Sequence, residues 1–113
     1  MLTIGKLREY GADVDTGLQR LMDNEEFYLK MVNVFLEEKN FANLEEALKA
    51  GDLTKAFEAA HALKGVSANL SLTPFYNVIY ELTELLRNGT QMDYSEYLDK
   101  VNQERQKLED LVK

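Results

Sequence analysis

Proline occurs only once in this chain of 113 residues, and several long stretches contain neither proline nor glycine. Within these stretches apolar residues recur at spacings of three and four, which is typical of amphipathic helices that pack together. We predict four long helices, over residues 25–50, 53–70, 74–88 and 93–112. The apolar stripe of the first changes face near Lys39 and Asn40, so this helix should kink or break there, or its two halves should face different neighbours. Long helices with short connections run antiparallel to their neighbours. The pattern therefore predicts an all-α fold, an antiparallel up-and-down four-helix bundle with short extra N-terminal helices covering one end.

Residues that favour helix N-caps precede the predicted segments. They are Thr3, Asp13 or Asp15, Asn24, Asp52, Thr73 and Asp93. Gly11 and Gly51 are placed to end helices, and Pro74 suits a first helical turn. Asp93 and Glu96 have the spacing of a capping box. Residues 102–107 are all polar, so we expect this stretch to stand clear of the core.

Length and composition bound the class of protein. The length suits one compact domain over residues 1–113. The absence of cysteine excludes disulfides and thiolate metal sites and fits a reducing cytoplasm. The formal net charge of −7 argues against nucleic acid and anionic membranes as main partners. No segment resembles a signal peptide or approaches the roughly 20 apolar residues of a membrane span. We expect a cytoplasmic monomer, and the initial methionine and complete bundle favour a free-standing protein.

The only histidine, His61, falls within the predicted helix 53–70. One face of that helix is a seam of small and apolar residues: Leu53, Ala56, Ala60, Leu63, Ser67 and Leu70. His61 points about 140° away from the centre of this seam, toward solvent. Lys64 and Gly65 follow it by three and four residues, so both are its neighbours on the helix surface.

Gly65 is the unusual residue of this helix. A glycine inside a helix costs roughly 1 kcal/mol relative to alanine, and the bundle seam does not require one on the outer face. Its effect there is to remove bulk beside the imidazole of His61, so that another molecule can approach closely. An exposed neutral imidazole is nucleophilic and can take up a covalent group. The Lys64 ammonium would balance an anion such as phosphate. These residues suggest a histidine that carries a phosphoryl group.

The run His61-Ala62-Leu63-Lys64-Gly65-Val66-Ser67-Ala68-Asn69-Leu70 resembles the H-x-L-K-G-x-S-x-x-L signature of histidine-containing phosphotransfer (HPt) domains. Residues 44–52 also resemble that family's approach to its histidine helix, and the resemblance covers most of the chain. The family usually has glycine after the final leucine. This chain has Ser71 there, at a helix end, so its local turn can differ.

The resemblance implies a phosphorelay intermediate. His61 would accept a phosphoryl group from a receiver-domain aspartyl phosphate and pass it to another receiver aspartate. The family implies Nε2 as the acceptor atom, whereas the sequence alone does not choose between the ring nitrogens. Lys64 would stabilise the phosphate charge and Gly65 would give steric access. The partners would be response-regulator receivers and a hybrid sensor histidine kinase.

The chain would be a phosphoryl carrier and not an autonomous enzyme. It has no glycine-rich nucleotide loop and no set of residues suited to zinc, so we expect no cofactor of its own. Mg²⁺ should come from the partner receiver. Docking should use small and apolar surface near His61. Ala68 would keep that face flat, and Phe57 would be either half-buried or part of the docking surface.

Plainer interpretations remain for each residue. His61 could be an ordinary surface histidine and Lys64 a solvated lysine, while Gly65 could relieve crowding between helices. Ser67 could be a small seam residue that bonds back to the Leu63 carbonyl. The alternative function is a helical binding module that docks and inhibits a receiver or histidine kinase without being phosphorylated, and it would tolerate His61→Gln. A structural helical adaptor is a third hypothesis.

Overall fold

The computed structural model describes residues 1–113 as seven helices without a β-strand. They are α1 (Ile4–Tyr10), α2 (Val14–Arg20), α3 (Glu25–Leu36), α4 (Asn40–Ala50), α5 (Leu53–Asn69), α6 (Thr73–Arg87) and α7 (Ser95–Val112). The predicted all-α class is therefore confirmed. None of these helices combines the length and the apolar character that a membrane crossing requires.

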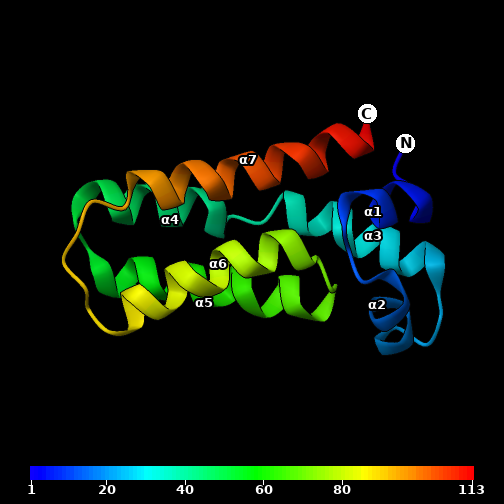
Figure 1. Ribbon diagram of the computed structural model, residues 1–113, viewed down its shortest axis with the longest axis horizontal. Helices are drawn as coiled ribbons and strands as arrows, with labels where there is room; N and C mark the ends of the chain where they lie inside the picture. Colours follow the sequence, from blue (N-terminus) through cyan, green and yellow to red (C-terminus); the bar gives the residue numbers. More distant parts are fainter.

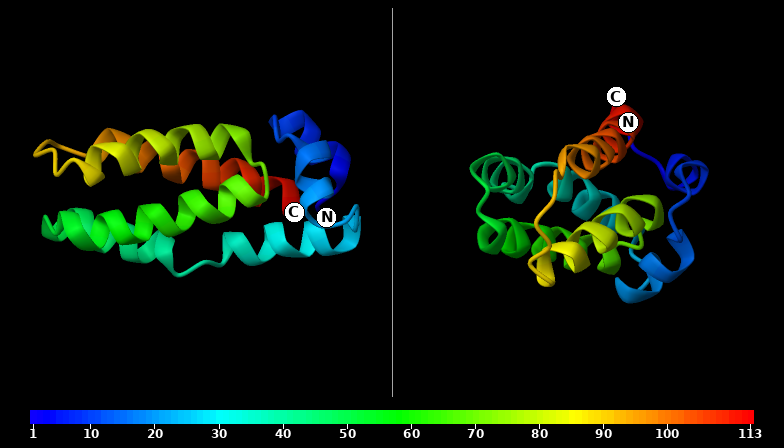
Figure 2. Two further views of the ribbon diagram at one scale, coloured as in Figure 1. Left: turned by 90° about the horizontal axis from the view of Figure 1, so that it is seen from below. Right: turned by 60° about the vertical axis from the view of Figure 1, so that its left-hand side comes forward.

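The helices form an elongated body of 41 × 25 × 20 Å. Figure 1 shows α3 and α4 end to end along the long axis, with α5, α6 and α7 running beside them in alternating directions. The short helices α1 and α2 lie at the end where the two chain termini meet (Figure 2). There the amino group of Met1 donates a hydrogen bond to the Lys113 carbonyl (2.8 Å).

Pairing between helices leaves one side of α5 uncovered. α5 packs mainly against α4 and α6, while α7 packs against α6, α3 and α1. The core between them contains three phenylalanines in edge-to-face contact, Phe35 of α3, Phe41 of α4 and Phe75 of α6. Their ring centroids lie 5.1–5.8 Å apart, within the range where such aromatic pairs attract.

The predicted break near Lys39 and Asn40 is present, because α3 ends at Leu36 and α4 begins at Asn40. Arg105 of α7 stabilises it by donating a hydrogen bond to the Leu36 carbonyl (2.9 Å), one of the carbonyls that a helix end leaves without a helical partner. Its guanidinium also lies 4.2 Å from the centroid of the Phe41 ring.

The expectation that residues 102–107 stand clear of the core is therefore wrong for Glu104 and Arg105, which are half-buried. Glu104 accepts a hydrogen bond from the Tyr10 hydroxyl (2.8 Å), and burial together with this carboxylate raises the pKa of Tyr10. Long polar side chains can cover apolar surface with their stems while their polar ends find partners. A polar stretch of sequence is thus compatible with packing.

Most of the predicted caps are confirmed. The side chains of Thr3, Asp13, Asn24 and Asp52 each accept a hydrogen bond from a backbone N–H in the first turn of the helix that follows.

The two caps predicted in the C-terminal half are wrong. Thr73 lies inside α6 and its hydroxyl donates to the Ser71 carbonyl instead (3.4 Å). Asp93 accepts from the backbone N–H of Ser95 (2.9 Å) in a local turn, and Glu96 does not close a capping box with it. Short polar side chains form local turns as readily as helix caps. The presence of such a residue before a predicted helix therefore does not decide between a turn and a cap.

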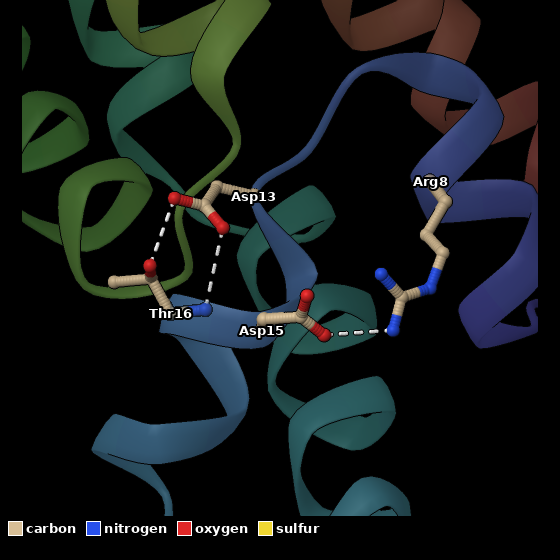
Figure 3. A network of polar contacts seen from close by, with 4 residues as sticks. All are labelled: Arg8, Asp13, Asp15 and Thr16. Atoms are coloured by element: carbon tan, nitrogen blue, oxygen red, sulfur yellow. Dashed lines mark hydrogen bonds and ion pairs between the residues drawn. The ribbon is translucent and has the colours of Figure 1, made fainter.

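An ion pair ties α1 to α2. Figure 3 shows Arg8 of α1 beside Asp15 of α2, with a distance of 2.8 Å between Nη2 and Oδ1, next to the Asp13 cap of α2 on Thr16. The hydrogen bond and charge of Arg8 hold the pKa of the Asp15 carboxyl below its ordinary value. Both side chains are exposed, so this pair orients the two short helices at small energetic benefit.

Candidate functional site

The helix α5 holds His61 by burying its opposite side. Asp52 caps the helix by accepting from the Lys55 N–H (3.0 Å). The predicted seam residues Ala56, Ala60, Leu63, Ser67 and Leu70 are all buried, whereas Leu53 is half-buried. His61 itself is exposed, as the helical period predicts. The imidazole therefore stands on the outer side of a helix whose inner side is anchored in the core.

Gly65 is exposed and surrounded by open space. A Cβ atom built on it would meet no heavy atom within 4 Å. The residue therefore relieves no crowding between helices of this chain. Gly65 lies one turn beyond His61 on the same helix, and no atom of the imidazole comes within 4 Å of the place where a Cβ of Gly65 would be.

Lys64 is half-buried and turned toward α6. Its Nζ lies 5.6 Å from the centroid of the Tyr80 ring, a cation–π contact with an exposed tyrosine of α6. It forms no ion pair with a carboxylate. The Lys64 ammonium is thus not held by a carboxylate of this chain.

Phe57 is half-buried, and its ring stacks on the imidazole of His61. The two ring centroids lie 5.5 Å apart and the ring planes differ by 19°. From α6, the guanidinium carbon of Arg87 lies 5.0 Å from the centroid of the Phe57 ring. The sequence leaves the place of Phe57 open, and no local pattern in it indicates Arg87.

Ser67 and Ala68 complete the set of predicted residues on this helix. Ser67 is buried, and its hydroxyl donates to the carbonyl of Lys64 (3.1 Å). The suggested bond to the Leu63 carbonyl is therefore not formed. Ala68 is half-buried. Its carbonyl accepts a hydrogen bond from Arg20 of α2, another residue that the sequence did not indicate.

The C-terminal end of α5 is fixed by several contacts. Arg20 also donates to Ser71 Oγ (2.9 Å), and the buried Tyr28 hydroxyl of α3 donates to the Leu70 carbonyl (2.7 Å). Burial, followed by the negative charge of Asp13, raises the pKa of Tyr28 to about 12. Ser71 has a φ of +54°, in the left-handed region that glycine adopts most readily. The chain thus keeps a glycine-like backbone at the position where the resembling family has glycine.

No group of three or more histidine, cysteine, aspartate or glutamate residues is arranged to hold a metal ion. The exposed imidazole, the bare turn and the cations on α5 and α6 are the features of this surface from which chemistry can be argued. Together they define a helical domain that presents an exposed imidazole on the outer side of a packed helix.

The sequence model of the Hpt domain matches residues 30–112, which is most of the chain, and the chain therefore belongs to the Hpt domain family. The matched region includes α4 to α7 and most of α3, and it leaves out α1 and α2. No curated protein and no solved structure gives a significant match to this chain. Membership makes the chain a phosphotransfer module of two-component systems, a class of phosphoryl carriers whose partners are receiver domains and kinases.

Proposed function

We propose that this protein is a phosphorelay intermediate in which His61 accepts a phosphoryl group from an aspartyl phosphate of one receiver domain and passes it to an aspartate of another. The observation that carries the proposal is the exposed imidazole beside an empty helical turn at Gly65. Such access costs the fold helical stability, and nothing inside the chain requires it. An approaching partner does require it.

The proposed transfer balances without a further reactant. The neutral imidazole attacks phosphorus through Nε2, the bond from phosphorus to the aspartyl oxygen breaks, and a nitrogen–phosphorus bond forms. The aspartate leaves as a carboxylate and the imidazole proton stays on Nδ1. The second receiver reverses these steps with its own carboxylate. Transfers of this kind depend on in-line positioning and on stabilisation of charge.

The other residues have supporting roles in this proposal. Lys64 stabilises phosphate charge, since it lies one turn from His61 and has no carboxylate partner. Gly65 gives steric access, and Ala68 keeps the docking face low. The receiver supplies Mg²⁺ and most of the catalytic groups, in a small and transient interface. We further propose a cytoplasmic monomer in which α3 with α4, α5, α6 and α7 form an antiparallel up-and-down four-helix bundle, covered at one end by α1 and α2.

A labelling experiment tests the proposal. The chain is mixed with receiver domains from the same genome, each phosphorylated with labelled phosphate. Wild-type protein should acquire label that is acid-labile and alkali-stable, and His61→Gln should acquire none. Glu9→Gln is the matched control, because Glu9 is an exposed residue of α1, outside the helix that carries His61, and it should be labelled like the wild type. Label that stays on a receiver while the complex still forms would contradict the relay and favour the inhibitory binding module.

A further inference from the structure

Phe57 lies against one face of the His61 imidazole in an offset, near-parallel arrangement, and neither ring nitrogen of the exposed His61 takes part in a hydrogen bond within the chain. Phe57 lies one turn earlier on α5, and the two rings are close to parallel, with centroids 5.5 Å apart. The ring nitrogens of an imidazole react in the plane of the ring. A stacked neighbour therefore restrains the ring without blocking either nitrogen, whereas an edge contact would cover one of them.

Restraint of this ring has a chemical benefit. An exposed side chain samples several staggered rotamers, and only some of them can aim Nε2 along the line of the breaking bond. Displacement of a reacting group by about 1 Å can cost roughly a hundredfold in rate. A contact that favours one orientation before the partner docks would raise the rate of transfer within the complex.

Phe57 can restrain His61 because Phe57 is itself held from two helices. It is half-buried against the core, and the Arg87 guanidinium of α6 lies 5.0 Å from its ring centroid. Arg87 is in turn 3.4 Å from the Glu84 carboxylate one turn earlier on α6. The chain of contacts from Glu84 through Arg87 and Phe57 to His61 thus connects the imidazole to the neighbouring helix.

We propose that Phe57 is a positioning residue for phosphoryl transfer at His61, held in place by Arg87. This inference rests on the proposed function, since it assigns the stack a role in that reaction. The sequence left Phe57 either half-buried or on the docking surface, and the structure shows it half-buried against the core. As a positioning residue it acts on the rate within the complex, whereas a docking residue would act on the affinity for the receiver.

The test compares Phe57→Leu, which keeps an apolar side chain without a ring, with Phe57→Tyr, which keeps the ring. Transfer from a phosphorylated receiver is measured as a function of receiver concentration. We expect Phe57→Leu to lower the maximal rate by about threefold to tenfold, the range that one aromatic pair supports. The half-saturating concentration should stay within twofold of the wild type, and Phe57→Tyr should restore the rate.

A second readout follows the imidazole without any phosphate present. A stacked benzene ring shifts the resonances of the His61 ring protons upfield in NMR spectra. Those resonances should move toward the values of an unstacked imidazole in Phe57→Leu and stay near the wild-type values in Phe57→Tyr. A general loss of folding would instead collapse the spectrum as a whole, which separates positioning from a structural role.

Arg87→Gln should lower the maximal rate in the same direction but by less, about twofold, because an exposed cation–π contact is weak. Lys100→Gln is the matched control: it removes a lysine 5.5 Å from the Tyr97 ring centroid on α7 and should leave the rate unchanged.

Two outcomes would overturn the inference while leaving the proposed function intact. One is a labelled Phe57→Leu protein with unchanged maximal rate and unchanged His61 resonances. The other is a raised half-saturating concentration at unchanged maximal rate, which would make Phe57 a docking residue. Absence of label on the wild-type chain would instead remove the proposed function itself.

Discussion

Two of the glycines that lie inside helices, Gly17 of α2 and Gly65 of α5, have opposite surroundings. A Cβ on Gly17 would lie 3.0 Å from the ring end of the buried Tyr28 and 3.1 Å from the Leu70 carbonyl oxygen. A Cβ on Gly65 would meet nothing within 4 Å. The first glycine is explained by packing inside the chain. The second has no explanation inside the chain, and this difference points to a molecule outside it.

The two regions around these glycines have different roles: one fixes the end of α5, and the other leaves the outer side of α5 exposed. Near Gly17, hydrogen bonds from Arg20 and Tyr28 fix the C-terminal end of α5. Near Gly65, the outer side of the same helix is free of packing, and His61 is exposed there. A well-anchored helix that presents an exposed imidazole suits transfer between partners, because the nucleophile is both accessible and held at a fixed place.

The largest effect should come from filling the open turn. Gly65→Leu should slow transfer from a phosphorylated receiver by about a hundredfold, since a side chain one turn from His61 obstructs the approach that the reaction needs. Gly65→Ala, in contrast, should raise the free energy of unfolding by about 0.5–1 kcal/mol through helix propensity. Transfer rates and urea denaturation measured on both variants separate access from stability. Unchanged transfer in Gly65→Leu would mean that the open turn is not the partner's approach.

A side chain added at Gly17, where there is no room for one, should lower stability and leave the transfer rate unchanged. Gly17→Ala should destabilise the fold by about 1–3 kcal/mol, because a buried ring and a backbone carbonyl must shift to admit the methyl group. Urea denaturation measures this loss, and the transfer rate of the folded fraction should stay close to that of the wild type. A stable Gly17→Ala protein with impaired transfer would contradict the division between the two regions.

The hydrogen bond from Tyr28, whose ring lies against Gly17, to the Leu70 carbonyl can be tested through its dependence on pH. Tyr28→Phe removes the hydrogen bond to the Leu70 carbonyl and should cost about 1 kcal/mol at neutral pH. The pKa of Tyr28 is raised from 10.0 to about 12 in the folded chain, so its neutral form is favoured there. The resulting stability is fully present below pH 10 and is lost as the pH rises toward 12. The free energy of unfolding, measured by urea denaturation at several pH values in that window, should fall less steeply with pH for Tyr28→Phe than for the wild type. An equal fall in the two proteins would contradict the raised pKa of Tyr28.

The smallest effect should come from removing the positive charge of Lys64 near His61. Lys64→Ala should slow transfer by about threefold to tenfold without unfolding the protein, because Lys64 is only half-buried and water screens its charge. Lys55→Ala, an exposed lysine of the same helix, is the matched control and should transfer like the wild type. Equal rates for the two variants would remove the role assigned to Lys64, and thermal melts would show whether either one is misfolded.

The sequence predicted what depends on neighbours along the chain. The helical periods, the break before Asn40 and the cap at Asp52 all follow from interactions within a few residues. The exposure of His61 also follows, since a helix with one apolar seam must turn its other side outward.

Contacts between helices were beyond the sequence, since they depend on how each helix is rotated against its neighbour. Arg87 reaches Phe57 from α6 and Arg20 reaches Ala68 from α2, and neither arginine has a local pattern that would single it out. The packing of Arg105 on Phe41 was missed because it lies in a polar stretch. Ser71 shows the same limit for the backbone, since its left-handed φ is set by the turn it occupies and not by its own preference.

The central claim, that His61 is the phosphoacceptor, is tested most directly by NMR of the phosphorylated chain. A protein labelled with ¹⁵N is incubated with a phosphorylated receiver, and its single imidazole is followed together with the ³¹P spectrum. We expect one phosphoramidate signal coupled to Nε2 of His61, with Nδ1 still carrying its proton. Phosphate found on any residue other than His61 would contradict this claim. So would an imidazole that stays unmodified while this chain carries phosphate from one receiver to a second.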